Sequence, residues 1–430
     1  MKVTLLGGSN SLYGCGIKTG ISSVANVQLS NYSLGASSAL QNLAACIENR
    51  ESIKESDLII AESNVNDSFN AAYLKLDLEV VKRNIAAFYS ELASLGKVVF
   101  VLILPLNTDR PGIIESDSII KEINEYHMAM IQKFGFFYVD LEEQCKNLPQ
   151  DKLNLLMPDC RHMKPLFLHE LLKNITTFFV RRLPIMGIEQ EFPSSKNVHK
   201  LLTAKDIADY NSLKCENIEN SYFSTNVVPL PLQAGAKIKF PELVWGDKLI
   251  GVGTFGTLES RKVAFKSRTN LVVKSFNELM AFNELVFELF VDFDLVLTYT
   301  DEETTEKVIL EKPKKDYDNR VNFYSFIFLS QIRDEFAIRI WEGAKNLQRL
   351  IPPAQYFMFD SDYCKKFISM REGSISSLSE VRSVMSIAEK LSDCDPQTAL
   401  DLARLVYKYV SSEPELKVVM DKIRAKAAKS

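Results

Sequence analysis

The sequence predicts an α/β domain with a doubly wound parallel sheet, followed by a β-rich, sandwich-like domain and a helical C-terminal region. Up to about residue 185, apolar runs alternate with stretches of helical periodicity, which is typical of a parallel sheet covered by helices. The apolar runs then become short and closely spaced, which indicates antiparallel strands. Helical periodicity returns near the end of the chain. The predicted divisions are a first domain 1–190, a linker 191–220, a β-rich accessory domain 221–345 and a helical region 346–430.

Apolar runs and one-sided apolar patterns define the elements of the first domain. The predicted strands are Lys2–Leu6, Val24–Asn31, Asp57–Ala61, Val98–Leu104 and Phe136–Leu141. The predicted helices are Ala39–Ile47, Leu76–Leu95, Ile119–Phe134 and Leu166–Arg181. Every residue of Val98–Leu104 is apolar, as expected of a parallel strand that is buried on both faces.

Short apolar runs in the second half of the chain favour a β-sandwich. The expected strands are Lys237–Phe240, Lys262–Phe265, Leu271–Val273, Leu285–Leu297, Lys307–Leu310, Val321–Leu329 and Phe336–Trp341. Gly251–Gly256 matches the glycine pattern of a dinucleotide-binding loop, but that loop requires a helix after its last glycine. Because Thr257–Lys266 is predicted as turn and strand, we interpret these residues as hairpin glycines.

Two helices are predicted in the C-terminal region. Asp395 and Pro396 are typical of an N-cap and a first-turn proline, and an apolar face continues from there to Tyr409. A second helix is predicted to begin at Pro414. Its basic end is interpreted as a solvated last turn that complements the helix dipole.

The composition excludes several classes of function. The net charge of −4 leaves no excess of Lys and Arg to neutralise nucleic-acid phosphates, so no nucleic-acid partner is predicted. The seven cysteines are scattered without a CxxC pair, and no zinc site or other metal site is predicted. The sequence shows neither a secretory signal nor an apolar span long enough to cross a bilayer. We therefore expect a cytoplasmic protein with no membrane span.

Candidate site residues follow the ends of the first three predicted strands. Gly7 and Gly8 tolerate a cramped turn, so Ser9 is predicted to emerge at the carboxyl end of a buried strand, where open α/β sheets place their sites. Gly35 follows the second strand and Asn64–Asp67 follow the third. The alternative interpretation of Ser9 is the N-cap of a helix.

The chain has four histidines, so the choice of a general base is narrow. His127 falls in a predicted helix, His199 lies beyond the first domain, and His169 is predicted to pack or to lie at the surface. His162 follows Asp159 by three residues in a loop. There the aspartate can accept a hydrogen bond from one ring nitrogen while the other faces a hydroxyl, as a serine nucleophile requires. The alternative is a turn closed by the aspartate, with a solvated histidine.

In this order, the motifs resemble those of the SGNH hydrolases, also called GDSL esterases. The resemblance covers roughly the first 180 residues, a span that suits one α/β domain. It implies acyl transfer through a covalent acyl-serine, with Ser9 as the nucleophile, His162 as the general base and Asp159 holding the imidazole. It further implies an oxyanion hole made of the Ser9 and Gly35 N–H groups and the Asn66 amide.

Two positions depart from the family pattern. Gly8 stands where the family usually has an aspartate, and Asn64 stands where it has a glycine. Asn64 is a candidate substrate-binding residue that would line the cleft, although an ordinary loop residue is the preferred interpretation. The loss of the aspartate leaves a catalytically degenerate binding module as an alternative to an enzyme.

The resemblance implies serine-dependent acyl-ester chemistry, and we expect a carbohydrate or an acylated small molecule as the substrate. The favoured function is an O-acetyltransferase of cytoplasmic polysaccharide biosynthesis, of the capsule or lipopolysaccharide type. No cofactor is expected to be bound, and acetyl-CoA is the expected co-substrate. The alternatives are a carbohydrate O-acetyl esterase and a degenerate glycan-binding or assembly module. The C-terminal helices are the expected contact with polysaccharide-assembly partners.

Overall fold

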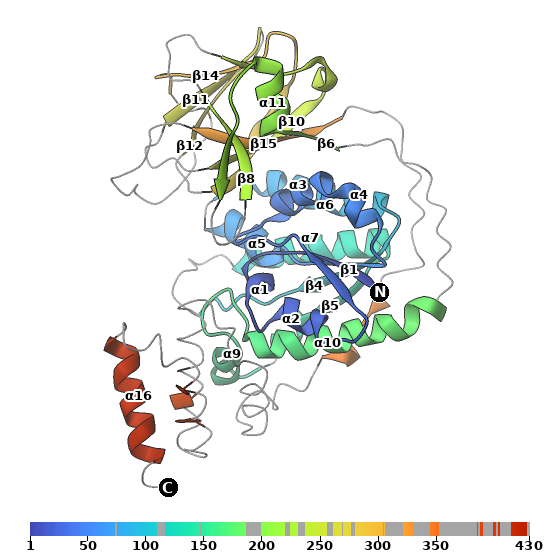
Figure 1. Cartoon of the computed structure of the whole chain (residues 1–430), viewed down its shortest axis with the longest axis vertical. Coiled ribbons are helices and arrows are strands. Elements are labelled where there is room, and N and C mark those ends of the chain that lie inside the picture. Colours follow the sequence, from blue (N-terminus) through green and yellow to red (C-terminus); the bar gives the residue numbers. More distant parts are fainter. Residues whose placement is uncertain are drawn as a thin grey trace.

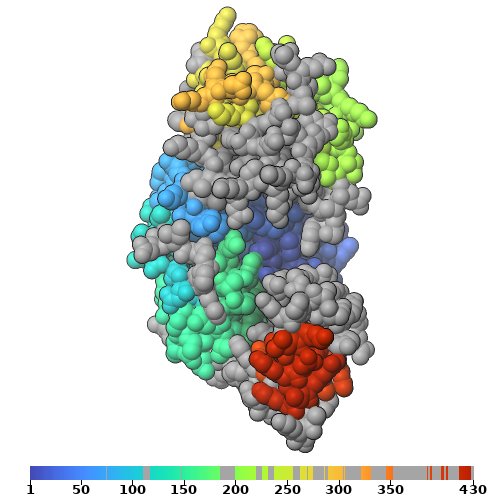
Figure 2. All heavy atoms as spheres, turned by 90° about the vertical axis from the view of Figure 1, so that its left-hand side faces the viewer, coloured from blue at the N-terminus to red at the C-terminus, as the bar shows by residue number. Residues whose placement is uncertain are grey.

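A computed structural model places an α/β domain beside a β-sandwich, with helix α16 (Pro414–Ala427) at the opposite end of the molecule from the sandwich (Figure 1). A view turned by 90° shows the same order along the long axis (Figure 2). The structure describes residues 1–73, 75–109, 117–146, 148–185, 199–219, 224–230, 237–255, 261–268, 270–276, 280–303, 305, 321–330, 345–351, 385, 388–389, 399–400, 403–404 and 414–427.

The α/β domain is built on a six-stranded parallel sheet in the order β16-β5-β4-β3-β1-β2. Its strands are β1 (Lys2–Leu6), β2 (Gln28–Asn31), β3 (Leu58–Ala61), β4 (Val98–Ile103), β5 (Phe137–Asp140) and β16 (Lys345–Asn346). The five strands predicted in the first domain are therefore confirmed. β2 begins later than predicted, because Asn26 adopts a left-handed turn conformation with φ 63°.

Helices cover both faces of this sheet, which confirms the doubly wound α/β fold (Figure 1). They are α1 (Ser9–Leu12), α2 (Ile17–Ser22), α3 (Ala39–Glu48), α4 (Arg50–Lys54), α5 (Asn64–Ala72), α6 (Leu78–Ser94), α7 (Asp117–Phe134), α8 (Leu141–Cys145), α9 (Gln150–Leu156) and α10 (Pro165–Arg182), with a 3₁₀ turn η1 (Leu183–Ile185). The four long helices α3, α6, α7 and α10 are the ones that the sequence predicts. The others are short, or polar as in α5, and carry no clear apolar periodicity.

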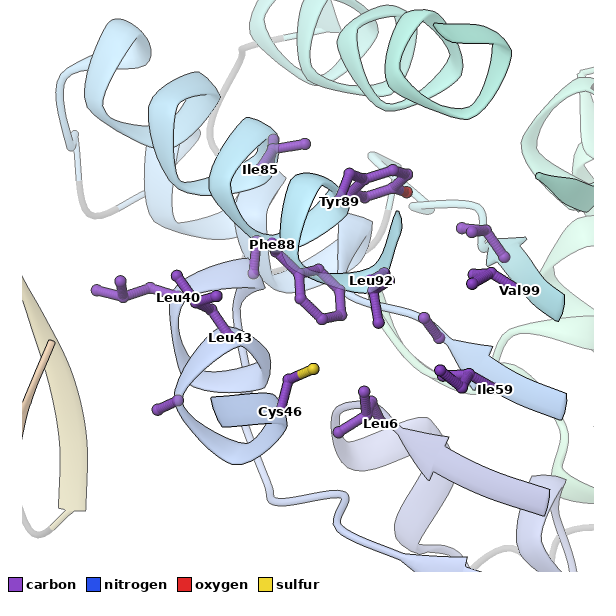
Figure 3. Close-up of a cluster of buried hydrophobic side chains, with 14 of the residues drawn as sticks. Leu6, Leu40, Leu43, Cys46, Ile59, Ile85, Phe88, Tyr89, Leu92 and Val99 are labelled. Carbon is purple, nitrogen blue, oxygen red and sulfur yellow. The ribbon is translucent and has the colours of Figure 1, made fainter. Parts of the chain in front are cut away.

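Alternate residues along each strand supply the two cores of the domain. One face packs against α3, α6 and α7, where Leu6, Ile59 and Val99 of the strands meet Phe88 and Leu92 of α6 (Figure 3). The other face packs against α2 and α10. Both faces of β4 are buried, as its unbroken apolar sequence predicts.

The second domain is a sandwich of two antiparallel sheets around one core. One sheet has the order β13-β10-β15-β8-β7 with β6 also paired to β15, and the other has the order β12-β11-β14-β9. The elements are β6 (His199–Thr203), α11 (Ala204–Asn211), β7 (Glu216–Glu219), β8 (Ser224–Pro229), β9 (Ile238–Lys239), η2 (Glu242–Val244), β10 (Lys248–Phe255), β11 (Arg261–Lys266), β12 (Leu271–Phe276), β13 (Met280–Phe290), β14 (Val296–Tyr299) and β15 (Asn322–Leu329).

Parts of this domain differ from the prediction. The predicted linker 191–220 contains β6, α11 and β7, because the polar helix α11 begins with a capping box between Thr203 and Asp206 rather than with an apolar signal. The apolar stretch predicted as one strand, Leu285–Leu297, forms the end of β13, a turn and β14. The predicted strands Lys307–Leu310 and Phe336–Trp341 lie outside the described residues.

The two domains share a core. The outer face of the first sandwich sheet contributes Ile250, Tyr324 and Ile327 to the cluster around α3 and α6. A Cβ atom at Gly251 would come within 2.7 Å of the Leu40 side chain, so this glycine permits close approach of β10 to α3. Gly251 and Gly253 thus lie within an antiparallel strand, which confirms that they belong to no dinucleotide-binding loop.

The chain returns to the first domain after the sandwich. β16 pairs in parallel with β5, and the 3₁₀ turn η3 (Gln348–Leu350) follows it. The predicted helix from Pro414 is confirmed as α16, and the described residues of the other predicted helix, 399–400 and 403–404, are helical. Among the described helices, none has both the length and the hydropathy needed to cross a bilayer.

Candidate active site

The turn after β1 brings Ser9 to the carboxyl edge of the parallel sheet. Gly8 is the extended N-cap residue of α1, and Ser9 opens the helix. A Cβ atom at Gly8 would overlap the Asn66 amide nitrogen, and one at Gly7 would overlap the Ser11 hydroxyl. The two glycines therefore leave room beside Ser9 for the Asn66 amide and the Ser11 hydroxyl, which a side chain at either position would displace.

Ser9, His162 and Asp159 form a continuous hydrogen-bonded chain. The Ser9 Oγ lies 2.7 Å from the His162 Nε2, and the His162 Nδ1 lies 2.7 Å from the Asp159 Oδ2. Donation from Nδ1–H to the carboxylate leaves Nε2 free to accept the serine proton. The edge of the Tyr13 ring packs against the imidazole, with the ring centres 5.4 Å apart.

The backbone of the loop 159–162 holds the Asp159 carboxylate in place against the imidazole. Its Oδ1 accepts hydrogen bonds of 2.8 Å from the Arg161 and His162 backbone N–H groups. Partial burial raises the pKa of Asp159, but the hydrogen bond and charge of His162 and these backbone donors outweigh it and lower the pKa to about 2. The carboxylate therefore stays ionised at neutral pH.

The predicted oxyanion groups lie around the same turn. Loop 33–38 is tied to the turn by a 3.0 Å hydrogen bond from Leu34 N–H to the Gly7 carbonyl, and Gly35 is exposed on this loop. The Asn66 amide donates one hydrogen bond of 2.9 Å to the Ser37 carbonyl, which leaves its second N–H for another acceptor. Next to Gly35, Ala36 has φ 58°, a conformation that costs an alanine energy and often marks functional loops.

Asn64 does not line a cleft. Its side chain is fully buried, donates to the Leu104 carbonyl at 2.8 Å and to Asn124 Oδ1 at 2.9 Å, and accepts from Leu104 N–H at 3.0 Å. These contacts fasten the end of β4 to α5. The predicted substrate contact of Asn64 is therefore wrong, because a polar residue after a strand can equally satisfy the backbone of the neighbouring strand.

Glu62 is a site residue that the sequence reasoning missed. Its buried Oε1 accepts from the Gly8 N–H at 2.6 Å and from the Ser11 hydroxyl at 3.0 Å, so the carboxylate supports the turn that carries Ser9. Burial raises the pKa of Glu62, and these hydrogen bonds offset the rise in part. The only sequence signal was its place directly after the third strand.

Arg161, the residue before His162, contacts a pair of aromatic rings on and just after α5. The guanidinium carbon of Arg161 lies 4.3 Å from the centre of the Phe69 ring, and Phe69 stacks on Tyr73 with ring centres 4.7 Å apart. Phe69 follows Asn66 by one turn of α5. Sequence reasoning singled out none of these three residues.

The other histidines have partners away from Ser9. His127 shares a hydrogen bond with the Tyr89 hydroxyl and donates one to the Asp67 carboxylate inside the core. His169 contacts Thr19, and His199 binds Glu91 at the domain junction. Within the described ranges, no group of three or more His, Cys, Asp or Glu side chains is placed to hold a metal ion.

No family model and no curated protein sequence matches the chain. Solved structures similar to its N-terminal part include an acetyl xylan esterase, AlAXEase, at 16% identity and a TM-score of 0.35, covering 42% of this chain and 98% of that one. A lipolytic protein of the G-D-S-L family from Veillonella parvula DSM 2008 is 18% identical with a TM-score of 0.34, covering 42% and 99% of the two chains. TesA is 15% identical with a TM-score of 0.33, covering 42% and 98%.

Proposed function

We propose that the N-terminal domain catalyses acyl-ester chemistry through an acyl-serine on Ser9. The observation that carries the proposal is the hydrogen-bonded chain from Ser9 Oγ through His162 to Asp159, with both distances at 2.7 Å. This arrangement activates a hydroxyl nucleophile and returns its proton later in the reaction. Its place at the carboxyl edge of a parallel sheet is the usual place for a site in such a fold.

In the first half-reaction, Ser9 Oγ attacks the carbonyl carbon of an ester or thioester while its proton passes to His162 Nε2. Negative charge develops on the carbonyl oxygen, and the Ser9 and Gly35 N–H groups with the Asn66 amide are the proposed donors to it. Each such donor is worth about 3 kcal/mol of barrier in comparable sites. The bond to the leaving group then breaks, and His162 protonates the departing oxygen or sulfur.

In the second half-reaction, an acceptor hydroxyl loses its proton to His162 Nε2 and attacks the carbonyl carbon of the acyl-serine. The bond from that carbon to Ser9 Oγ then breaks, and His162 returns the proton to Ser9. Water as the acceptor releases an acid, and a sugar hydroxyl as the acceptor gives a new ester. We propose a carbohydrate hydroxyl as the acceptor and acetyl-CoA as the donor, within polysaccharide biosynthesis. The C-terminal helices are the proposed contact with assembly partners.

The position of the sandwich supports an extended acceptor. Tyr324 of β15 donates a hydrogen bond of 3.2 Å to Gln41 in the first turn of α3, and loop 33–38 with Gly35 directly precedes that turn. The sandwich therefore stands beside the loop that borders Ser9.

The nucleophile is tested with a serine-reactive fluorophosphonate and mass mapping of the labelled peptide. We expect the label on Ser9 and its loss in Ser9→Ala, while Ser94→Ala, a helix-end serine of the same domain, keeps both label and turnover of 4-nitrophenyl acetate. His162→Ala should lower turnover by a factor on the order of 10⁴. A label on Ser11 or Ser37, or only a tenfold loss in His162→Ala, contradicts the proposed triad, whereas absence of both label and turnover in the unaltered protein favours a binding module.

The acceptor is tested by incubating the protein with acetyl-CoA and candidate glycans while thiol release and glycan mass are followed together. A gain of one acetyl group that depends on Ser9 supports transfer. Loss of acetate from acetylated glycans, with acetyl-CoA unchanged, supports the carbohydrate esterase instead.

A further inference from the structure

We propose that Arg161 is an anion-binding residue of the acyl-transfer site, which holds a carboxylate or phosphate group of the substrate beside Ser9 and His162. The inference rests on the proposed function and specifies its substrate class. Four observations carry it: the fixed backbone of Arg161, the direction of its side chain, its lack of a counter-ion, and the charge of the surrounding chain.

The backbone of Arg161 is fixed on both sides by neighbours of the catalytic groups. Its N–H donates to Asp159 Oδ1 at 2.8 Å, and its carbonyl accepts from Asn10 Nδ2 at 3.0 Å. Asn10 directly follows Ser9, and Asp159 holds His162. The backbone of Arg161 is therefore held by hydrogen bonds to residues that neighbour Ser9 and His162.

The side chain extends toward α5, the helix that also carries Asn66. Its guanidinium carbon lies 4.3 Å from the centre of the Phe69 ring, and Phe69 is backed by the stacked ring of Tyr73. Phe69 lies on α5, one turn beyond Asn66. A guanidinium that stacks on an aromatic face keeps its in-plane N–H groups available for a planar anion.

No carboxylate of the described residues neutralises this cation. The Arg161 Nε is buried and has no hydrogen-bond partner, and none of the ion pairs in the described ranges includes Arg161. Arg50 shows the usual arrangement, because its Nε donates to Glu91 at 2.8 Å and its Nη2 binds the same oxygen. A buried donor without a partner is costly in the free protein, and an anion bound at the Nη groups would supply the counter-charge that the described residues do not.

The net negative charge of the chain indicates that anion binding at Arg161 would be local, and not the effect of a generally basic protein. The protein carries a net charge of −4, so it has no general attraction for anions. An arginine fork binds carboxylate and phosphate in the same two-point manner. The anion has two sources in the proposed reaction: an acidic sugar of the acceptor, or a phosphate of the acyl donor.

Binding is measured in the Ser9→Ala protein, so that no turnover is needed, by NMR titration with glucose, glucuronate and glucose 6-phosphate. We expect one or both anionic sugars to bind at least about tenfold more tightly than glucose, with a preference that shrinks at high salt because exposed charge is screened. Preference for glucuronate alone assigns the anion to the acceptor, and preference for the phosphate alone assigns it to a phosphorylated substrate.

Arg161→Gln should abolish the preference, and Arg161→Lys should retain part of it, because lysine keeps the charge but loses the planar fork. The matched control is Arg349→Gln, since Arg349 also lies over a phenylalanine ring, Phe178, at 5.8 Å, and should keep the full preference. Circular dichroism and the lysine variant separate a binding loss from misfolding.

Equal binding of all three sugars, or a preference that survives Arg161→Gln, overturns the inference. Failure of the acyl-serine mechanism is seen separately, as absence of Ser9 labelling in the unaltered protein. An anion preference that depends on Arg161, found without Ser9 labelling, would keep the anion-binding residue and remove the catalytic proposal.

Discussion

At the scale of single residues, the turn that carries Ser9 depends on a carboxylate from the neighbouring strand. A side chain at Gly8 would displace the Asn66 amide, and Glu62 reaches the same turn from the end of β3 through the Gly8 N–H and the Ser11 hydroxyl. At this turn, Gly8 leaves space for its neighbours, and the buried Glu62 accepts the hydrogen bonds.

We predict that Glu62→Gln preserves the turn, because an amide oxygen can still accept from Gly8 and Ser11, whereas Glu62→Ala leaves both donors unpaired. Each buried unpaired donor costs about 1–3 kcal/mol. Chemical denaturation should therefore rank the unfolding free energies as native and Glu62→Gln above Glu62→Ala, with turnover following the same order. Equal losses in the two variants would remove Glu62 from the support of the turn.

The raised pKa of Glu62 predicts a pH dependence of stability. A buried acid with a raised folded pKa is harder to ionise than in the unfolded chain, so its ionisation destabilises the fold as pH rises above the unfolded value of about 4.3. The glutamine of Glu62→Gln cannot ionise, so the unfolding free energy of this variant should fall less as pH rises. Unfolding free energies of both proteins between pH 4 and 8 provide the measurement, and parallel curves would contradict the prediction.

Asp159 contributes to the pH dependence of stability in the opposite direction from Glu62. Its folded pKa of about 2 lies below the unfolded value of about 3.9, so it stabilises the fold above the unfolded pKa and loses that contribution as pH falls toward 2. Asp159→Asn should flatten the stability profile over this acid range. Turnover at neutral pH should fall by a factor on the order of 10⁴, because an amide favours the wrong tautomer of His162. Retained turnover would exclude Asp159 as the group that orients His162.

Sequence reasoning brought Ser9, His162 and Asp159 together correctly, because several motifs in one order were considered together, whereas each motif alone also has an ordinary structural interpretation. It misplaced Asn64 and missed Glu62 and Arg161. Whether a polar side chain faces a cleft or a neighbouring backbone depends on packing between strands that are distant in the sequence, and no local pattern encodes that.

At the scale of elements, apolar runs and long helices were predictable, whereas α5 was not. α5 begins with Asn64, Val65, Asn66 and Asp67, all buried, and their polar side chains are satisfied by contacts with other elements. Tertiary hydrogen bonds, rather than an apolar face, define this helix.

The contact of β10 with α3 provides a prediction at this scale. Gly251→Ala places a Cβ atom against Leu40 and should lower the unfolding free energy by about 1–3 kcal/mol through overpacking. Leu40→Ala alone leaves a cavity, but in the double variant it makes room for the new methyl group. The double-mutant cycle should therefore show a favourable coupling of about 0.5–3 kcal/mol. Strictly additive losses would show that the two elements do not press on each other.

At the scale of the whole molecule, a buried charge network joins the two domains. Glu91 of α6 binds Arg50 and, through its other oxygen at 3.0 Å, the His199 Nδ1 at the start of β6. Both Glu91 and His199 are 2% exposed. Burial raises the pKa of Glu91, but His199 and Arg50 outweigh it and hold that pKa below its usual value. A two-domain division of the chain was predictable, but this junction was not, because its residues lie far apart in the sequence.

We predict that Glu91→Gln lowers the unfolding free energy by about 3–5 kcal/mol, because it leaves a buried arginine without its counter-charge. The matched control is Glu51→Gln, which breaks an exposed pair with Lys54 and should change stability little. Since the folded pKa of Glu91 is depressed, the junction should also weaken as pH falls below about 4.3. Limited proteolysis between the domains, compared at pH 7 and pH 4, provides the second measurement.

The pairing of β16 with β5 has a consequence for synthesis of the protein. The outer edge of β5 acquires its partner only when residues 345–346 have left the ribosome, after the entire sandwich has been translated. At 5–20 residues per second, that edge waits about 10–40 s after β5 itself emerges. An unpaired parallel strand is a template for pairing with other chains, so the nascent protein passes through a period in which a chaperone has a defined strand to protect.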